Sequence, residues 1–155
     1  MNKNIQIILK NFPNFISILT LICGLTALKF GLHKKWESVI YLLILAAILD
    51  FLDGWLARKF KSESFFGAEL DSLSDFISFG ISPILIIYFW TLDKIGYLGW
   101  FGVLFFSICS ALRLARFTAD LHIIDINIDK NKYFTGVPSP ASASLILLPV
   151  LINFE

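Results

Sequence analysis

The sequence predicts an all-α fold, a polytopic membrane bundle of helices forming one domain over residues 1–155, and two observations support this. Of the 155 residues, 57% are hydrophobic and 16% are charged, whereas soluble domains average about 45–50% apolar and about 25% charged residues. The apolar residues also gather in five runs long enough, as helices, to enter or cross a bilayer core. These runs are residues 14–32, 37–57, 65–90, 96–117 and 140–154.

The opening segment, NKNIQIILKNF, precedes the first run and mixes polar with apolar residues. Its Ile5, Ile7, Ile8 and Phe12 stand among polar neighbours, a pattern typical of a short amphipathic helix lying on the membrane surface. A frayed terminus is the alternative. Pro13 follows and directly precedes the first span.

The later runs differ in how they are bounded. Pro83 lies inside the third run, where we expect a kink. We expect residues 118–138 to form a charged loop between the fourth and fifth spans. The fifth run is short for a full crossing at about 1.5 Å per residue, so either it continues beyond Glu155 in a longer chain or it is only partly sunk in the membrane. The connections at 33–36 and 91–95 are too short to be linkers between domains.

The lysines and arginines predict the orientation in the cell membrane. If the N-terminus is inside, nine of the 13 basic residues fall on the cytoplasmic side and four on the other. Cytoplasmic segments of membrane proteins carry an excess of such residues, so we expect the N-terminus inside. The formal net charge of the whole chain is only +1, which gives no electrostatic reason to expect a nucleic acid as partner.

Four aspartates interrupt the apolar chain where the second run ends and the third begins. On the second run, two aspartates, a glycine and an alanine are spaced i, i+3, i+4, i+7. On the third run, a glycine and two aspartates are spaced i, i+4, i+8. Each of these sets therefore shares one face of a helix. Two pairs of carboxylates are therefore expected to face each other across a helical hairpin, close to the cytoplasmic surface. The positions are Asp50, Asp53, Gly54 and Ala57 on the second run, and Gly67, Asp71 and Asp75 on the third.

The energy of placing these acids in a membrane indicates what they do. A carboxylate at the bilayer centre costs roughly 2.5–3.5 kcal/mol, and four together repel one another. Hard divalent cations remove that penalty. Oxygen ligands with neither histidine nor thiolate in the cluster favour Mg²⁺ or Mn²⁺ over Zn²⁺, and two ions would suit the transfer of a phosphoryl group.

Three other interpretations of the aspartates remain open. The acids could pair with Arg58, Lys59 and Lys61 at the helix end. They could line the pathway of a cation transporter, which predicts acids inside further spans, where this sequence has none. They could belong to a structural membrane subunit, which leaves the glycines beside them unexplained.

The same stretch resembles the signature of the CDP-alcohol phosphatidyltransferases. It reads DFLDGWLAR at 50–58 and, after eight residues, GAELDSLSD at 67–75, and it matches every defined position of that signature. Members of the family are integral membrane enzymes, usually dimers of subunits with six transmembrane helices. They displace CMP from a CDP-linked lipid or alcohol with an acceptor hydroxyl. The resemblance covers the chain from about Pro13 onward and departs from the family in having five predicted spans, which implies a domain without the sixth, C-terminal helix.

Carried over by position, the resemblance implies a role for each residue. Asp50, Asp53 and Asp71 would be metal ligands, and Asp75 would bind a second ion and act as the general base. Arg58 would hold the pyrophosphate, for which a guanidinium fork is well shaped. Contacts to the nucleotide and CDP-lipid are implied at Asn14, in the PNFIS segment, and at Gly54, Ala57, Arg58, Ser64 and Gly67.

Two further segments resemble those of the phosphatidylserine synthases within this family, SALRLARFTAD at 110–120 and YFTGVPSPASAS at 133–144. Arg113 and Arg116 are spaced i, i+3, so either could grip the carboxylate of serine or the lipid phosphate. The alternative is that both arginines only extend to the membrane surface. We therefore expect transfer of a phosphatidyl group from CDP-diacylglycerol, or an ether-lipid equivalent, to L-serine by a homodimer surrounded by membrane lipids. Sister enzymes that use glycerol 3-phosphate or inositol phosphate would call for more positive charge near the site.

Overall fold

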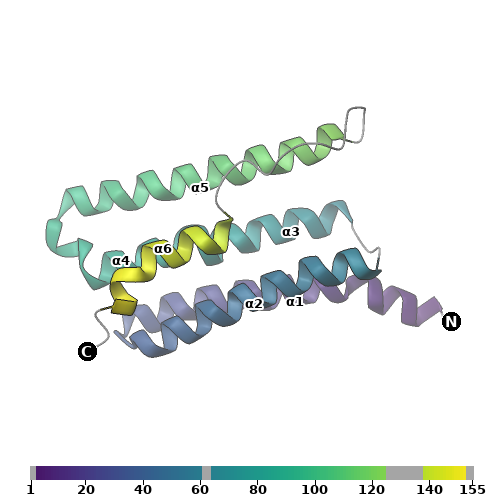
Figure 1. Ribbon diagram of the computed structural model, residues 1–155, viewed down its shortest axis with the longest axis horizontal. Coiled ribbons are helices and arrows are strands. Elements are labelled where there is room, and N and C mark those ends of the chain that lie inside the picture. The colour runs from purple at the N-terminus through teal and green to yellow at the C-terminus, as the bar shows by residue number, and fades with distance from the viewer. Residues whose placement is uncertain (1–2, 61–63, 125–137, 153–155) are drawn as a thin grey trace.

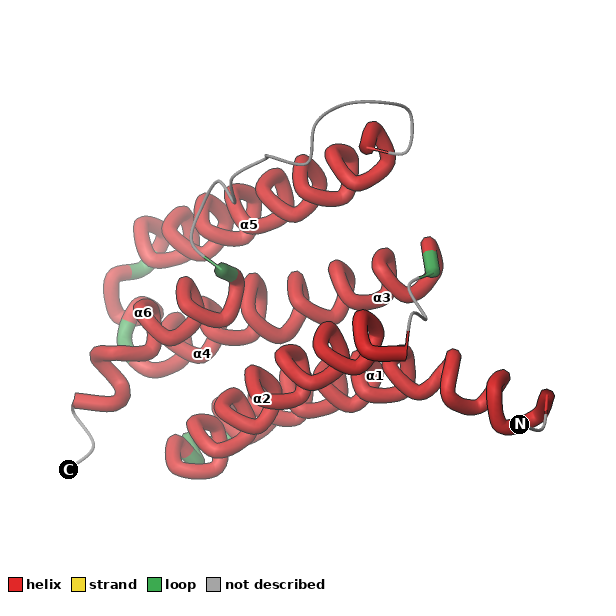
Figure 2. The backbone as a smooth tube through the Cα atoms, turned by 45° about the vertical axis from the view of Figure 1, so that its right-hand side comes forward, coloured by secondary structure: helices red, strands yellow, loops and turns green. Residues whose placement is uncertain are grey.

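The computed structural model describes residues 3–60, 64–124 and 138–152, and this part of the chain is helical and contains no strand. The helices lie alongside one another in an elongated bundle (Figure 1), and the tube in Figure 2 shows the same arrangement from a second side. In chain order the elements are α1 (Lys3–Leu32), α2 (Trp36–Phe60), α3 (Phe65–Asp75), the π-helical η1 (Phe76–Ile81), α4 (Ser82–Trp90), the 3₁₀-helical η2 (Leu92–Ile95), α5 (Tyr97–Ile124) and α6 (Ser139–Ile152).

Four of the helical stretches are long and apolar enough to cross a membrane, and the predicted membrane bundle is confirmed. They are Phe12–Leu32, Trp36–Phe60, Phe65–Trp90 and Tyr97–Arg116, while the fifth apolar stretch, Ser139–Val150, is shorter. Large apolar side chains are exposed along these helices, for example Phe105 and Leu98 of α5. Such a surface suits an integral membrane protein, because lipid tails rather than water surround it.

The opening segment and the first span form one helix. The segment is helical, as predicted, but it is the first part of α1, which runs unbroken through Pro13. A proline inside a helix removes one backbone donor and strains the preceding turn, and α1 tolerates this near its beginning. The side chains of residues 3–11 lie outside the described part, so their position on the membrane surface stays a prediction.

The irregularity expected at Pro83 lies just before it, as η1. Here the N–H of Ser82 bonds to the carbonyl of Ile77, five residues back. In an α-helix the ring of Pro83 would clash with the carbonyl four residues earlier. The wider π-helical turn that precedes Pro83 relieves this crowding, and such bulges are a known cause of irregular helices.

The prediction of a loop at 118–138 is wrong for its first seven residues, because α5 continues to Ile124. The segment TADLHII contains neither proline nor glycine, so nothing in it ends a helix. The Thr118 hydroxyl donates to the carbonyl of Leu114 over 2.8 Å, which satisfies that side chain within the helix. Residues 125–137 lie outside the described part.

Polar contacts tie the third span to α1. Ser78 donates its hydroxyl to the carbonyl of Thr20, and Ser82 donates to the carbonyl of Gly24, both over 3.1 Å. Apolar contacts hold the rest of the bundle, and α6 packs into the same core as α1, α2 and α4. That core cluster consists of Ala27, Val39, Leu43, Ile86, Ile87, Leu147 and Val150.

The packing places the acidic stretch at one end of the bundle. Here α2 ends and α3 begins, and the N-terminal half of α1 runs beside them (Figure 1). Side chains from three helices can therefore meet at this end.

Candidate metal and nucleotide site

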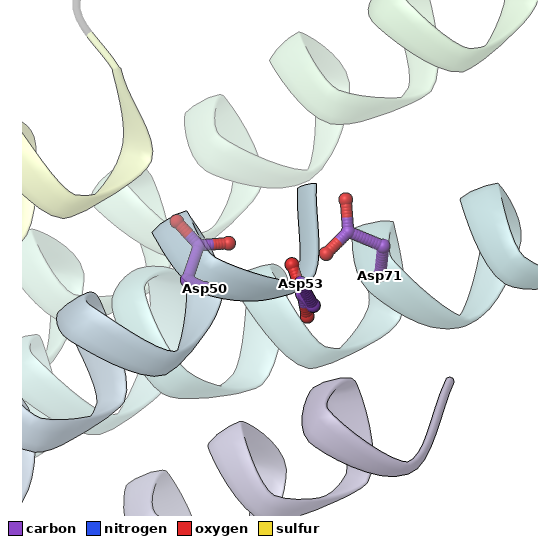
Figure 3. Close-up of side chains that lie close together, drawn as sticks. All are labelled: Asp50, Asp53 and Asp71. Atoms are coloured by element: carbon purple, nitrogen blue, oxygen red, sulfur yellow. The ribbon is translucent and has the colours of Figure 1, made fainter. Parts of the chain in front are cut away.

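Three of the four predicted aspartates converge. Asp50, Asp53 and Asp71 each offer a carboxylate oxygen, and these oxygens all lie within 4.8 Å of one another. Figure 3 shows that Asp50 and Asp53 come from α2 and Asp71 from α3. Asp53 is only 3% exposed, and the other two are half-buried. The prediction that the two helices present their acids to each other is confirmed for these three residues.

Asp75, one turn after Asp71, joins the group through Asp50. Its carboxyl group lies close enough to that of Asp50 for the two to interact directly. Oδ1 of Asp75 is buried and finds no hydrogen-bond partner among the described residues. A buried carboxylate oxygen without a donor is unfavourable, so this oxygen is available to a group that the protein alone does not supply.

The donor set fits a divalent cation. It offers carboxylate oxygens only, which Mg²⁺ and Mn²⁺ prefer, and a cation would offset the repulsion between acids held this close. The unpartnered Oδ1 of Asp75 would gain a partner in the same way.

Ser17 of α1 also reaches the cluster, and the sequence did not single it out. Its hydroxyl donates to Oδ2 of Asp53 over 2.7 Å, and Ser17 is only 4% exposed. The residue lies in the PNFIS segment, one turn after Asn14, so its helical face could have been inferred from Asn14. Which hydroxyl of α1 meets α2 depends on how the two helices are rotated, and this is not encoded in either segment alone.

Gly54 and Ala57 lie on the α2 face that carries the aspartates. A Cβ built on Gly54 would have no atom within 4 Å, so the glycine borders open space beside Asp50 and Asp53. Arg58 is exposed, and its Nε donates to the carbonyl of Gly54 over 3.1 Å. The backbone of α2 thus borders open space at this point.

Asn14, Ser64 and Gly67 form a separate set of contacts where α1 meets the start of α3. The Ser64 hydroxyl accepts from the N–H of Gly67 over 3.1 Å and so caps α3. A Cβ on Gly67 would lie 2.8 Å from Oδ1 of Asn14. The Asn14 side chain therefore already occupies the space that Gly67 leaves, and the glycine lets α1 and α3 approach each other.

Arg113 and Arg116 lie on α5, which runs beside the third span. The two helices come close where Gly80 faces Ser110, since a Cβ on Gly80 would lie 3.3 Å from Cβ of Ser110. From there α5 runs back toward the end of the bundle at which α2 ends and α3 begins (Figure 1). The two arginines follow Ser110 by about one and two turns. Arg113 is half-buried and Arg116 is exposed.

The basic residues at the end of α2 have partners other than the aspartates. Lys59 lies over the ring of Trp55, 4.4 Å from its centroid, and Arg58 bonds to its own helix. Lys61 lies outside the described residues. The geometry of Arg58 and Lys59 therefore argues against the interpretation of the aspartates as helix-end acids paired with them.

Known proteins with similar sequences share one family. The family model of the CDP-alcohol phosphatidyltransferases matches residues 10–155. Three similar curated proteins each carry the name CDP-diacylglycerol–serine O-phosphatidyltransferase. The one from Mycobacterium bovis is 39% identical over 140 residues, which are 90% of this chain and 47% of that protein. The one from Helicobacter pylori is 36% identical over 142 residues, 92% of this chain and 58% of that protein.

The third, from Bacillus subtilis, is 35% identical over 144 residues, 91% of this chain and 76% of that protein. The chain thus spans about half the length of the mycobacterial relative and three quarters of the one from Bacillus. Since the family model covers nearly the whole chain, this protein belongs to the CDP-alcohol phosphatidyltransferase family.

Proposed function

We propose that this protein transfers the phosphatidyl group of CDP-diacylglycerol, or of an ether-lipid equivalent, to the hydroxyl of L-serine, forming phosphatidylserine and releasing CMP. The observation that carries the proposal is the convergence of Asp50, Asp53 and Asp71 from two helices, with Asp75 linked to them. Family membership supplies the reaction class. The names of the relatives, together with the two downstream segments, support serine as the acceptor.

The acidic residues would divide into ion ligands and a base. Asp50, Asp53 and Asp71 would hold one Mg²⁺ or Mn²⁺, and Asp75 would contribute to a second. Bound there, the ions would neutralise the diphosphate and the charge that develops on the leaving CMP. The aspartates of α2 and α3 would hold the ions to which the diphosphate binds.

Asp75 would take the proton of the serine hydroxyl as the reaction proceeds. The serine oxygen forms a bond to the phosphatidyl phosphorus, the bond from that phosphorus to the CMP oxygen breaks, and the electron pair leaves with CMP. The signature contains no cysteine or histidine, and the resemblance assigns no nucleophilic role to its two serines, Ser72 and Ser74. We therefore propose one direct in-line displacement without a covalent enzyme intermediate.

Neighbouring residues would position the two substrates. The open space at Gly54, with Ala57 beside it, admits the cytidine diphosphate, and Arg58 would turn from its own helix to the pyrophosphate. Asn14, Ser64 and Gly67 would border the nucleotide at the start of α3. Arg113 and Arg116 would bind the serine carboxylate or the lipid phosphate. We further propose that this end of the bundle faces the cytoplasm, with the N-terminus inside, and that the protein acts as a homodimer.

One assay tests the acceptor. The purified full-length protein in detergent or nanodiscs is given CDP-diacylglycerol and Mn²⁺, with labelled serine, glycerol 3-phosphate or inositol phosphate in parallel reactions. We expect the label from serine in a phospholipid product and an equal amount of CMP. Preferential incorporation of either phosphorylated acceptor would refute the serine assignment and leave the reaction class in place.

A further inference from the structure

The contact between Ser17 and Asp53 is unlike the other hydroxyl contacts of α1. Thr20 and Thr26 donate to carbonyls of their own helix, at Ile16 and Ile22. Ser17 could do the same, because the carbonyl of Pro13 lies 3.3 Å from its hydroxyl. The carboxylate of Asp53 is nearer, at 2.7 Å, and a hydrogen bond to a charged acceptor is shorter and stronger. The single hydroxyl proton therefore points across to α2.

Both partners of this contact are buried. Ser17 is 4% exposed and Asp53 is 3% exposed, so water does not compete well for either group. A buried carboxylate oxygen that loses its donor becomes unfavourable, and the side chain would then rotate or draw in water. The hydroxyl of Ser17 thus restricts the orientation of one of the three converging carboxylates.

Asn14 gives α1 a second contact, with the helix that carries Asp71 and Asp75. Its side chain packs on Gly67 of α3, one turn away from Ser17 on α1. The helix thus touches both elements that carry the aspartates, α2 through Ser17 and α3 through Asn14. Among the described residues, α1 itself contributes no carboxylate to the cluster of Asp50, Asp53 and Asp71.

We infer that Ser17 is a positioning residue for the metal centre. By holding Oδ2 of Asp53, it directs the other oxygen of that carboxylate toward the ion and so tunes ion affinity without being a ligand. This inference rests on the proposed metal-dependent function. Partners that orient metal ligands typically contribute about 10- to 100-fold in metal affinity.

Mn²⁺ binding without substrates tests the inference. The electron paramagnetic resonance signal of free Mn²⁺ is titrated against the purified full-length protein and its variants. We expect Ser17→Ala to weaken Mn²⁺ binding by about tenfold and Ser17→Thr, which keeps the hydroxyl, to bind like the wild type. Ser82→Ala is the matched control, because it removes another buried serine hydroxyl that donates to α1 but touches no carboxylate there. It should leave the affinity unchanged.

Each outcome has a distinct meaning. Unchanged affinity in Ser17→Ala, or an equal loss in Ser82→Ala, overturns the positioning role and leaves the proposed transferase function standing. If the wild type itself binds no Mn²⁺, the metal-dependent function fails and the inference fails with it. Should Ser17→Ala prove too unstable to purify, Ser17→Cys keeps the side-chain size with a weak donor, and its affinity must fall in the same direction.

Discussion

Gly24 of α1 and Ser78 of η1 lie in backbone contact. A Cβ on Gly24 would come within 2.7 Å of Cα of Ser78, and the Ser78 hydroxyl donates to the carbonyl of Thr20 on the same helix. Small residues that let helix backbones approach are typical of packing within membranes. This contact fixes the third span against α1. It thereby fixes the position along the bundle axis at which Asp71 meets Asp53.

Gly24→Ala should therefore destabilise the fold. The added methyl group meets backbone, which yields less easily than a flexible side chain, and overpacking typically lowers the free energy of unfolding by about 1–3 kcal/mol. Thermal unfolding in detergent measures the change. Gly102→Ala on α5 is the control, because a Cβ there meets nothing within 4 Å. Equal midpoints for the two variants would contradict the tight contact.

Gly54→Ala should separate stability from substrate binding. No atom lies within 4 Å of the added Cβ, so the unfolding midpoint should stay at the wild-type value or rise slightly. If the nucleotide approaches this face, the methyl group displaces it, and kcat/KM for CDP-diacylglycerol should fall about tenfold or more. A variant with normal kinetics would place the nucleotide elsewhere.

Asp71→Asn should be more stable than the wild type without divalent ions and should gain less stability when they are added. Without ions, the variant should unfold at a higher temperature, because it removes one of the repelling charges. With Mn²⁺ at about 100 times its dissociation constant, the wild type should gain about 2.7 kcal/mol and the variant much less. Unfolding scans with a chelator and with Mn²⁺ measure both effects. Asp93→Asn, at the exposed η2, should behave as the wild type in both conditions.

Asp75→Asn should abolish turnover and leave nucleotide binding measurable. The amide has nearly the same shape but cannot accept the proton of the serine hydroxyl, and loss of a general base typically costs about 10²–10⁴-fold in rate. Turnover is followed as CMP release, and CDP binding is followed by calorimetry. Retained activity would refute Asp75 as the base.

Arg113→Gln and Arg116→Gln should show which substrate the arginines hold. A lost hydrogen bond to a charged group is worth about 1.5–3 kcal/mol, so KM for serine should rise by about tenfold or more in the variant that removes the carboxylate contact. KM for CDP-diacylglycerol should stay constant. A rise in the lipid KM instead would assign the arginine to the lipid phosphate. If neither constant moves, the arginines only extend to the membrane surface.

The fold and the acidic cluster could be predicted because both depend on helical periodicity. Asp50 and Asp53 are one turn apart, and the hairpin that follows is short, so α2 and α3 must present their acids to each other. Apolar length alone predicted the four long spans. These features are local, or nearly so, and one sequence contains them.

The remaining features depend on how the helices pack. Ser17 meets Asp53 only because close contacts such as that of Gly24 with Ser78 set the rotation of α1. Likewise, α1 continues through Pro13 and α5 continues past Phe117, because no residue at those points outweighs the hydrogen bonding of a long helix. The rotation of a helix and the residue at which it ends depend on many contacts together. A pattern of residue types along one sequence does not predict them.

The wide turn of η1 has a consequence for insertions and deletions in the third span. Each residue of an α-helix advances the side-chain direction by about 100°, so removing one residue between Asp75 and Pro83 would swing one half of the span relative to the other. Either the aspartates would turn from α2, or Ser82 would leave the carbonyl of Gly24. The six residues of η1 thus set the rotation between the two halves of the span, so that the first half faces α2 and the second half faces α1. A change in the length of η1 should therefore be harder to accommodate than a change in its composition.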